Sequence, residues 1–236
     1  MKKVFLAACI LTSYNFAISQ ATTGSSIQKD FGMISNLGKA QSGFESFQTY
    51  SSKAVNGSQF LPDTWSEGSV TTSNNITISS NYLFLYDKVN QNLYIKVKDS
   101  NLVVVTDKQQ VSYFTFKGDK NYLFAKASIY DSSASSNFLQ VLVAGNYTLL
   151  KSIITTYEKA DPNDLERARS GDHSDAFVDH EVYYIYYNHK LQKIKLNENS
   201  LRKAIPNNTK LNDYLNLHEE SEINEAFLIN LITGLN

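Results

Sequence analysis

The sequence predicts an α+β protein of mostly antiparallel strands: a β-meander, as a curved sheet or an open barrel, with a short C-terminal helical segment. Three observations predict it. Residues 48–157 are rich in Tyr, Phe, Val, Ile and Thr, which suit a pleated, half-buried surface. Apolar and polar residues alternate along several short stretches of this region. After residue 196 the apolar spacing changes to that of amphipathic helices.

Residues 1–19 are predicted to be a cleaved signal peptide. Lys2 and Lys3 precede a short apolar run, and small residues at Ala17 and Ser19 fit the signal-peptidase rule. The apolar run is much shorter than the ~20 residues that span a bilayer. We therefore expect no transmembrane segment in the mature chain.

Cys9 is the only cysteine of the chain, so cleavage after Ser19 would leave a mature protein without disulfides. The stretch from Leu6 to Cys9 also resembles a bacterial lipobox, and lipidation of Cys9 is the alternative. Lys3 lies closer to Cys9 than a usual apolar signal region allows, which favours cleavage. The sequence thus predicts an exported protein that is periplasmic, associated with the outer membrane, or secreted.

Residues 20–47 are predicted to be an N-terminal segment that can hold a short helix, although its glycines weaken the helical pattern. Residues 48–236 are expected to form one β-rich domain. Its strands are predicted, from the alternation of apolar residues, at 76–86, 93–97, 102–105, 111–116, 122–126, 138–144 and 147–157. Gly145-Asn146 suits a two-residue hairpin turn that would pair Leu142 with Leu149 and Val141 with Leu150.

A second hairpin is predicted over 182–196, where Asn188-His189 forms the turn and Tyr183 pairs with Ile194. The acidic stretch 159–181 before it has few strongly apolar residues, so it is predicted to be an exposed loop.

The C-terminal segment 197–236 is predicted to form three short helices. Asn197 can cap the first, Asn207 or Asn208 the second, and Ser221 a third over 222–233. Apolar residues in this last helix recur at intervals of four, and we expect this stripe to pack on the sheet: Ile223, Phe227 and Leu231.

The chain carries no signature of a common catalytic site. Its formal net charge of −1 argues against a nucleic-acid partner. Neither a phosphate-binding loop, a dinucleotide motif nor a Gly-x-Ser-x-Gly nucleophile motif occurs, so no catalytic residue and no cofactor is predicted. His173 and His180 lie among carboxylates and are the candidate metal ligands, although a solvated acidic loop explains the same pattern.

Three stretches carry a resemblance to a known group of proteins. They are 56–70, the hairpin 138–151, and the stretch from Tyr183 through Leu196 to Ala204. Together they resemble a group of secreted proteins of Bacteroidetes-type bacteria. The group's last hairpin turns on Asn-Gly, whereas this chain has Asn188-His189. The resemblance implies a bacterial envelope origin and brings no activity, cofactor or site residue.

Three hypotheses for function follow. The first is a non-catalytic envelope protein that binds another macromolecule or has a structural role. The second is a carrier or sensor of an apolar ligand held in a curved sheet, and the third is a metal-dependent hydrolase centred on His173 and His180. Trp65 and the tyrosines are either core residues or aromatics on an exposed sheet face that stack on glycans or line a pocket.

The mass of the exported protein tests the predicted cleavage of the signal peptide. Cleavage before Gln20 should give a product that lacks residues 1–19 and carries no lipid. Intact-mass measurement of the protein recovered outside the cytoplasm checks this, and a diacylglycerol adduct on Cys9 would contradict it.

Overall fold

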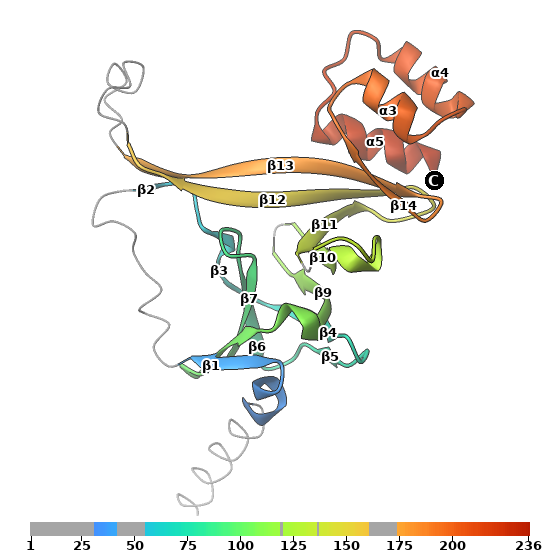
Figure 1. Ribbon diagram of the computed structural model, residues 1–236. Coiled ribbons are helices and arrows are strands. Elements are labelled where there is room, and N and C mark those ends of the chain that lie inside the picture. Colours follow the sequence, from blue (N-terminus) through green and yellow to red (C-terminus); the bar gives the residue numbers. More distant parts are fainter. Residues whose placement is uncertain (1–30, 42–54, 119, 136, 161–173) are drawn as a thin grey trace, which may run out of the picture.

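In the part of the chain that the structure describes, the strands form two sheets. The computed structural model describes residues 31–41, 55–118, 120–135, 137–160 and 174–236 (Figure 1). One sheet has five strands in the order β1-β8-β7-β6-β3, and the other has nine, in the order β14-β13-β12-β11-β10-β9-β4-β5 with β2 beside β13. The predicted class, mostly antiparallel β with C-terminal helices, is confirmed. The chain nevertheless builds two sheets where the sequence predicted one curved sheet or an open barrel.

The five-stranded sheet contains a meander of three consecutive strands and two edge strands. Its members are β1 (Gly38–Gln41), β3 (Phe60–Ser66), β6 (Tyr82–Asp87), β7 (Asn92–Val97) and β8 (Val103–Thr106). The edge strand β1 was not predicted, because it lies in the segment 20–47 that the sequence separated from the β-domain. Its first residue, Gly38, approaches β8 so closely that a Cβ atom would lie 1.8 Å from the Val105 carbonyl oxygen. Of the described residues in the segment 20–47, residues 31–35 are helical, as predicted.

The nine-stranded sheet contains two long strands, β12 and β13, followed by the short edge strand β14. Its members are β2 (Val55–Asn56), β4 (Gly68–Thr72), β5 (Thr77–Ile78), β9 (Val111–Phe116), β10 (Tyr122–Lys126), β11 (Phe138–Val143), β12 (Thr148–Glu158), β13 (Asp175–Tyr187) and β14 (Lys190–Ile194). Short 3-10 turns, η2 (Lys108–Gln110) and η3 (Ala127–Ile129), flank β9 and β10. Only Glu67 separates β3 from β4, so the chain passes from one sheet to the other within a single residue.

β13 is longer than the sequence predicted. Residues 175–181, which were assigned to an exposed loop, are strand residues, and 176–181 pair with β12 from Glu158 to Ile153. The acidic residues that suggested a loop are placed at the margin of the sheet, where Asp179 and Glu181 each meet a lysine from another strand or turn. Residues 161–173 of the predicted loop lie outside the described residues.

The predicted register is confirmed for the last hairpin and is partly wrong for the earlier one. Tyr183 pairs with Ile194 as predicted, and both turn residues, Asn188 and His189, have positive φ, the signature of a type I′ turn. In the earlier hairpin a bulge shifts the register, so that Leu149 faces Val143 instead of Leu142.

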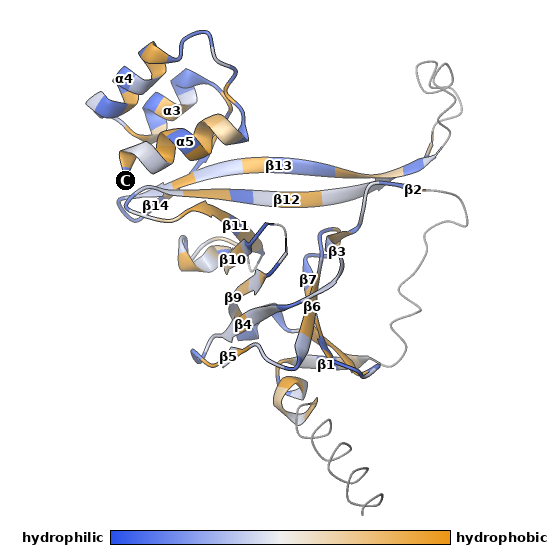
Figure 2. Cartoon of the chain, turned by 180° about the vertical axis from the view of Figure 1, so that it is seen from behind, coloured by the Kyte–Doolittle hydropathy of each residue, from blue (hydrophilic) through white to orange (hydrophobic). Residues whose placement is uncertain are grey.

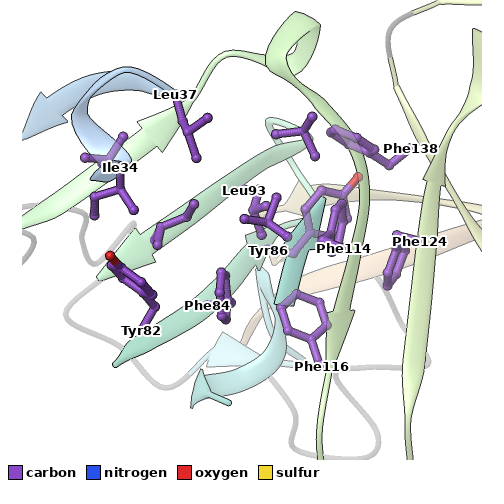
Figure 3. Packing of buried hydrophobic residues seen from close by; sticks show 14 of the residues in the cluster. Ile34, Leu37, Tyr82, Phe84, Tyr86, Leu93, Phe114, Phe116, Phe124 and Phe138 are labelled. Carbon is purple, nitrogen blue, oxygen red and sulfur yellow. The ribbon is translucent and has the colours of Figure 1, made fainter. Parts of the chain in front are cut away.

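The first hydrophobic core lies between the two sheets (Figure 3). The ring of Phe114 stacks on Phe124 at 4.8 Å, and Tyr86 from the other sheet contacts both rings at 5.2 Å. Ile34 and Leu37, from the segment before β1, close one end of this core. Aromatic side chains thus fill the space between the sheets.

Three helices cover the end of the nine-stranded sheet near β14 (Figure 1). Asn197 caps α3 (Glu198–Ala204), and Asn208 caps α4 (Thr209–Leu217), as the sequence predicted. Asn224 instead of Ser221 caps α5 (Glu225–Leu235), so Ile223 lies before the helix. None of the helices in the described ranges is long and apolar enough to cross a membrane.

The predicted apolar stripe packs on the sheet. Phe227 and Leu231 are buried in a second core with Leu149 and Ile185 of the long strands. Phe227 also meets the ring of Tyr214 edge to face at 5.4 Å. The helices therefore form a second covering layer of the nine-stranded sheet.

Both cores lie on the same face of the nine-stranded sheet. Phe124, Gln140, Lys151 and Tyr183 are cross-strand neighbours in register on β10, β11, β12 and β13. Directly opposed residues in antiparallel strands share a face. Phe124 belongs to the core under the five-stranded sheet and Tyr183 to the core under the helices, so polar residues mark the junction between the two layers.

Removing the aromatic ring of Phe227 should destabilise the protein. Phe227→Ala leaves a cavity in the second core and should lower the free energy of unfolding by about 3–5 kcal/mol. Leu217→Ala is the matched control on the neighbouring helix, because Leu217 is 80% exposed and should change stability by less than ~0.5 kcal/mol. Chemical denaturation of both variants measures the difference, and equal midpoints would contradict the packing.

Candidate functional site

The first candidate site is a buried charged cluster at the junction of the two layers. The ammonium group of Lys151 on β12 lies 2.9 Å from a carboxylate oxygen of Glu181 and 2.5 Å from one of Glu225. The Tyr183 hydroxyl faces Oε2 of both Glu181 and Glu225, at 2.7 and 3.0 Å. Only 9% of the Lys151 side chain is exposed. Because Glu225 is the first residue of α5, the cluster joins the helical layer to the sheet.

The surroundings of this cluster shift the pKa values of Lys151, Tyr183 and Glu181. Burial disfavours the charged form of Lys151, but hydrogen bonds and attraction from Glu225 and Glu181 outweigh it and raise the pKa of Lys151. Burial and the carboxylates raise the pKa of the Tyr183 hydroxyl above its usual value. The pKa of Glu181 is lowered: burial would raise it, but the Tyr183 hydroxyl and the Lys151 ammonium outweigh burial. The cluster thus supplies neither a neutral amine nor a phenolate for nucleophilic or base catalysis.

A second ion pair, between Lys88 and Asp179, holds the β6–β7 turn against the exposed edge of β12. The Lys88 ammonium lies 2.7 Å from a carboxylate oxygen of Asp179 on β13, and only 8% of the Lys88 side chain is exposed. Asp179 also accepts a hydrogen bond from the Thr155 hydroxyl. The Gln91 side chain in the same β6–β7 turn donates to the Ile153 carbonyl oxygen at 2.8 Å, and the Thr155 amide donates to the Lys88 carbonyl oxygen at 3.3 Å. This turn covers strand groups that would otherwise be free to pair with another chain.

Of the two candidate metal ligands, only His180 lies within the described residues. His180 lies on β13, is exposed, and its Nε2 is 2.9 Å from the Thr156 hydroxyl. His173 lies outside the described residues. Among the residues that the structure describes, no group of three or more His, Cys, Asp or Glu side chains could hold a metal ion.

The second candidate site is the face of the nine-stranded sheet that points away from both cores, here called the outer face. Alternation and register assign to it the uncharged positions of six neighbouring strands: Thr77 of β5, Ser69 and Thr71 of β4, Tyr113 and Thr115 of β9, Leu123 and Ala125 of β10, Leu139 and Val141 of β11, and Leu150, Ser152 and Ile154 of β12. A wet sheet face ordinarily mixes in charged side chains. None occurs at these positions, and the charged residue in the same alternation is Glu158, at the end of β12.

The segment that follows β10 covers one part of the outer face and leaves another open. Tyr130 and Ala134 pack over Leu139 and Leu150 and bury them. Burial, with smaller effects from Tyr113 and Tyr186, raises the pKa of Tyr130 to about 12. Beyond this cover, Tyr113 and Leu123 are each 36% exposed.

Hydroxyl groups flank the exposed ring of Tyr113. Ser69 and Thr115 are hydrogen-bonded at 2.8 Å, and Thr71 and Thr77 at 3.1 Å. Thr71 is the cross-strand neighbour of Tyr113. Each hydroxyl pair uses one hydrogen in its own bond, so each retains a second hydrogen that can be donated to a ligand.

Open clefts lie elsewhere on the described surface. One of about 320 Å³ lies beside Pro62, Phe116 and Lys120, and one of about 290 Å³ beside Glu67, Asn81 and Lys98. The Lys98–Glu67 ion pair at the second cleft is solvent-exposed and contributes little stability. Trp65, on the far side of the five-stranded sheet, packs against Leu85 and Tyr94 and lies under the ammonium group of Lys96.

Comparison with known proteins adds no relative: the chain matches no family model, no curated protein sequence and no solved structure.

Sequence reasoning did not find the Lys151 cluster. A local signal was present, because Lys151 interrupts an apolar strand after Leu149 and Leu150. Its partners Glu181 and Glu225 come from a different strand and a helix, so their meeting depends on the fold. Figure 2 shows the corresponding hydrophilic stretches within the long strands β12 and β13.

Removing the Lys151 charge should destabilise the protein and change its pH dependence. Lys151→Met leaves Glu181 and Glu225 facing each other, at a cost of about 1–3 kcal/mol, below that of a fully buried pair because both carboxylates are partly exposed. Lys98→Met is the control, since its ion pair is solvent-exposed and contributes little stability.

The sign of the pH effect follows from Glu181. Its lowered pKa gives stability that is fully present above the ordinary Glu value of ~4.3 and is lost as pH falls through the folded-state value. Without the Lys151 ammonium this contribution shrinks. The difference in thermal midpoint between wild type and Lys151→Met should therefore be larger at pH 7 than at pH 3.5, and an equal difference at both would contradict this role.

Proposed function

We propose that the protein is exported and acts in the cell envelope as a non-catalytic binding protein that contacts its partner through the outer face. The observation that carries this proposal is the uncharged outer face itself, which spans six strands and exposes Tyr113 and Leu123. Exposed apolar groups gathered on one surface are typical of an interaction site. The signal peptide predicted at residues 1–19 and the resemblance to secreted proteins of Bacteroidetes-type bacteria support the location.

The charged groups of the junction also favour binding over catalysis. Lys151 and Tyr183 are held in the protonation states that make them poor nucleophiles and bases. Their hydrogen bonds go to Glu181 and Glu225, which fasten α5 to the sheet. This gives the cluster a structural role.

The carrier hypothesis receives less support. A carrier of an apolar ligand needs an unfilled apolar cavity on the concave side of its sheet. Between the two sheets, the rings of Phe114, Phe124, Phe138 and Tyr86 instead contact one another at 4.8 to 6.3 Å. The described clefts are open, and charged side chains contribute to their walls.

Charges placed on the outer face should release the protein from its partner. The double variant Thr115→Lys, Leu123→Lys puts two ammonium groups on cross-strand neighbours, where a matching apolar or neutral surface would have to desolvate them. In the bacterium that makes the protein, we expect the variant to move from the envelope-bound to the soluble exported fraction.

Thr64→Lys is the matched control, because Thr64 is an exposed strand position of the other sheet. Its distribution should equal that of the wild type, and all three proteins should unfold at similar temperatures. Retention of the double variant in the envelope at the wild-type level would contradict the proposal.

A further inference from the structure

We propose that the ligand of the outer face is a neutral glycan, whose sugar ring packs against Tyr113 while its hydroxyl groups bond to the flanking serine and threonine pairs. This inference rests on the proposed function, since it assigns a ligand class to the same surface. It combines three observations: the exposed aromatic ring, the hydroxyl pairs on neighbouring strands, and the lack of charge at the outward positions of β5, β4, β9, β10 and β11.

The aromatic ring and the hydroxyl pairs match the two kinds of surface on a sugar. A pyranose ring has a face of C–H groups and a rim of hydroxyls. Tyr113 offers an apolar ring with a polar hydroxyl tip, a combination suited to surfaces that are partly apolar and partly wet. Thr71 lies directly beside Tyr113 in register, and Thr77 lies directly beside Thr71, so donors and acceptors extend from the ring across β4 to β5.

The distribution of charge selects a neutral ligand. An anionic polysaccharide would need cationic partners, and the neighbours of Tyr113 on the outer face are the half-buried Thr71 and Thr115 and the exposed Leu123. A purely apolar protein partner would leave the remaining hydroxyl hydrogens of two serine and threonine pairs unsatisfied on burial, which is unfavourable. A neutral, hydroxyl-rich ligand satisfies both requirements.

The segment after β10 gives the site a wall. Tyr130 packs over Leu139 and Leu150. It also lies close enough to Tyr113 for Tyr113 to contribute to the raised pKa of Tyr130. The open strands therefore form a floor that is bounded on one side by aromatic side chains. This shape suits an extended chain of sugar units that runs across the strands.

Affinity electrophoresis of the mature protein in gels that contain a neutral polysaccharide tests the inference. The probes are dextran, a β-glucan and a galactomannan, with the anionic polymer alginate as the charged comparison. At least one neutral polymer should retard the wild type, and alginate should not. Tyr113→Ala should weaken binding about 30-fold, the loss typical of a central aromatic contact, whereas Tyr113→Phe should stay within about threefold of wild type.

The double variant Thr71→Val, Thr77→Val should weaken binding while leaving the fold intact, and Leu102→Ala, at an exposed residue just before β8 of the other sheet, should have no effect. Circular dichroism of each variant excludes misfolding as the cause. Absence of retardation by every neutral polymer, equal retardation by alginate, or wild-type binding by Tyr113→Ala would each overturn the glycan assignment. A dimer that dissociates on Tyr113→Ala would also overturn it, by identifying a second copy as the occupant.

The two proposals fail separately. If no polysaccharide binds but the lysine double variant at Thr115 and Leu123 still leaves the envelope, the outer face is a binding surface for another ligand class. If neither effect is seen, both proposals are wrong.

Discussion

The width of the nine-stranded sheet is the constraint on which the rest of the structure depends. Its inward face is apolar over most of its area and must be covered, because exposed apolar surface is unfavourable in water. The five-stranded sheet covers one part and the C-terminal helices cover another. Neither layer reaches the full width, so the strip between them carries polar residues.

Lys151 is the charged residue at the centre of this polar strip. A lysine with its ammonium group buried is costly unless the charge is paired and hydrogen-bonded. Glu181 from the sheet and Glu225 from the first turn of α5 supply this pairing, and Tyr183 adds hydrogen-bonding capacity to both carboxylates. The need to pair the buried Lys151 charge therefore determines where α5, and with it the helical layer, is attached to the sheet.

Local features of the fold could be predicted from the sequence, and non-local ones could not. The register of the last hairpin follows from Asn188-His189 and its flanking residues, because a two-residue turn fixes the pairing. The caps at Asn197 and Asn208 are similarly local. The first part of β13 was missed because Asp179 and Glu181 resemble loop residues until their lysine partners, distant in sequence, are known.

The candidate site shows the same division. The sequence identified strand aromatics as possible glycan contacts, but the alignment of Tyr113 with Thr71 and Thr77 depends on the pairing of β4 with β9, whose residues are about forty positions apart. β1 was missed for a related reason. Gly38 weakened a helical pattern in the sequence, whereas in the fold its missing side chain permits close approach to β8.

The single-residue passage at Glu67 has a consequence for the order of folding. β6, β7 and β8 pair through short connections, as do β11 and β12, so these units can form early. β3 pairs with β6 and β4 with β9, and the two strands are covalently continuous. We expect this continuous strand to dock late, since it must find two partners at once and bring the sheets face to face as it does so. Pulse-labelled hydrogen exchange would then show protection in β6 and β7 before β4, and simultaneous protection would contradict this order. The sandwich would close in one cooperative step, with the two sheets unable to mature independently.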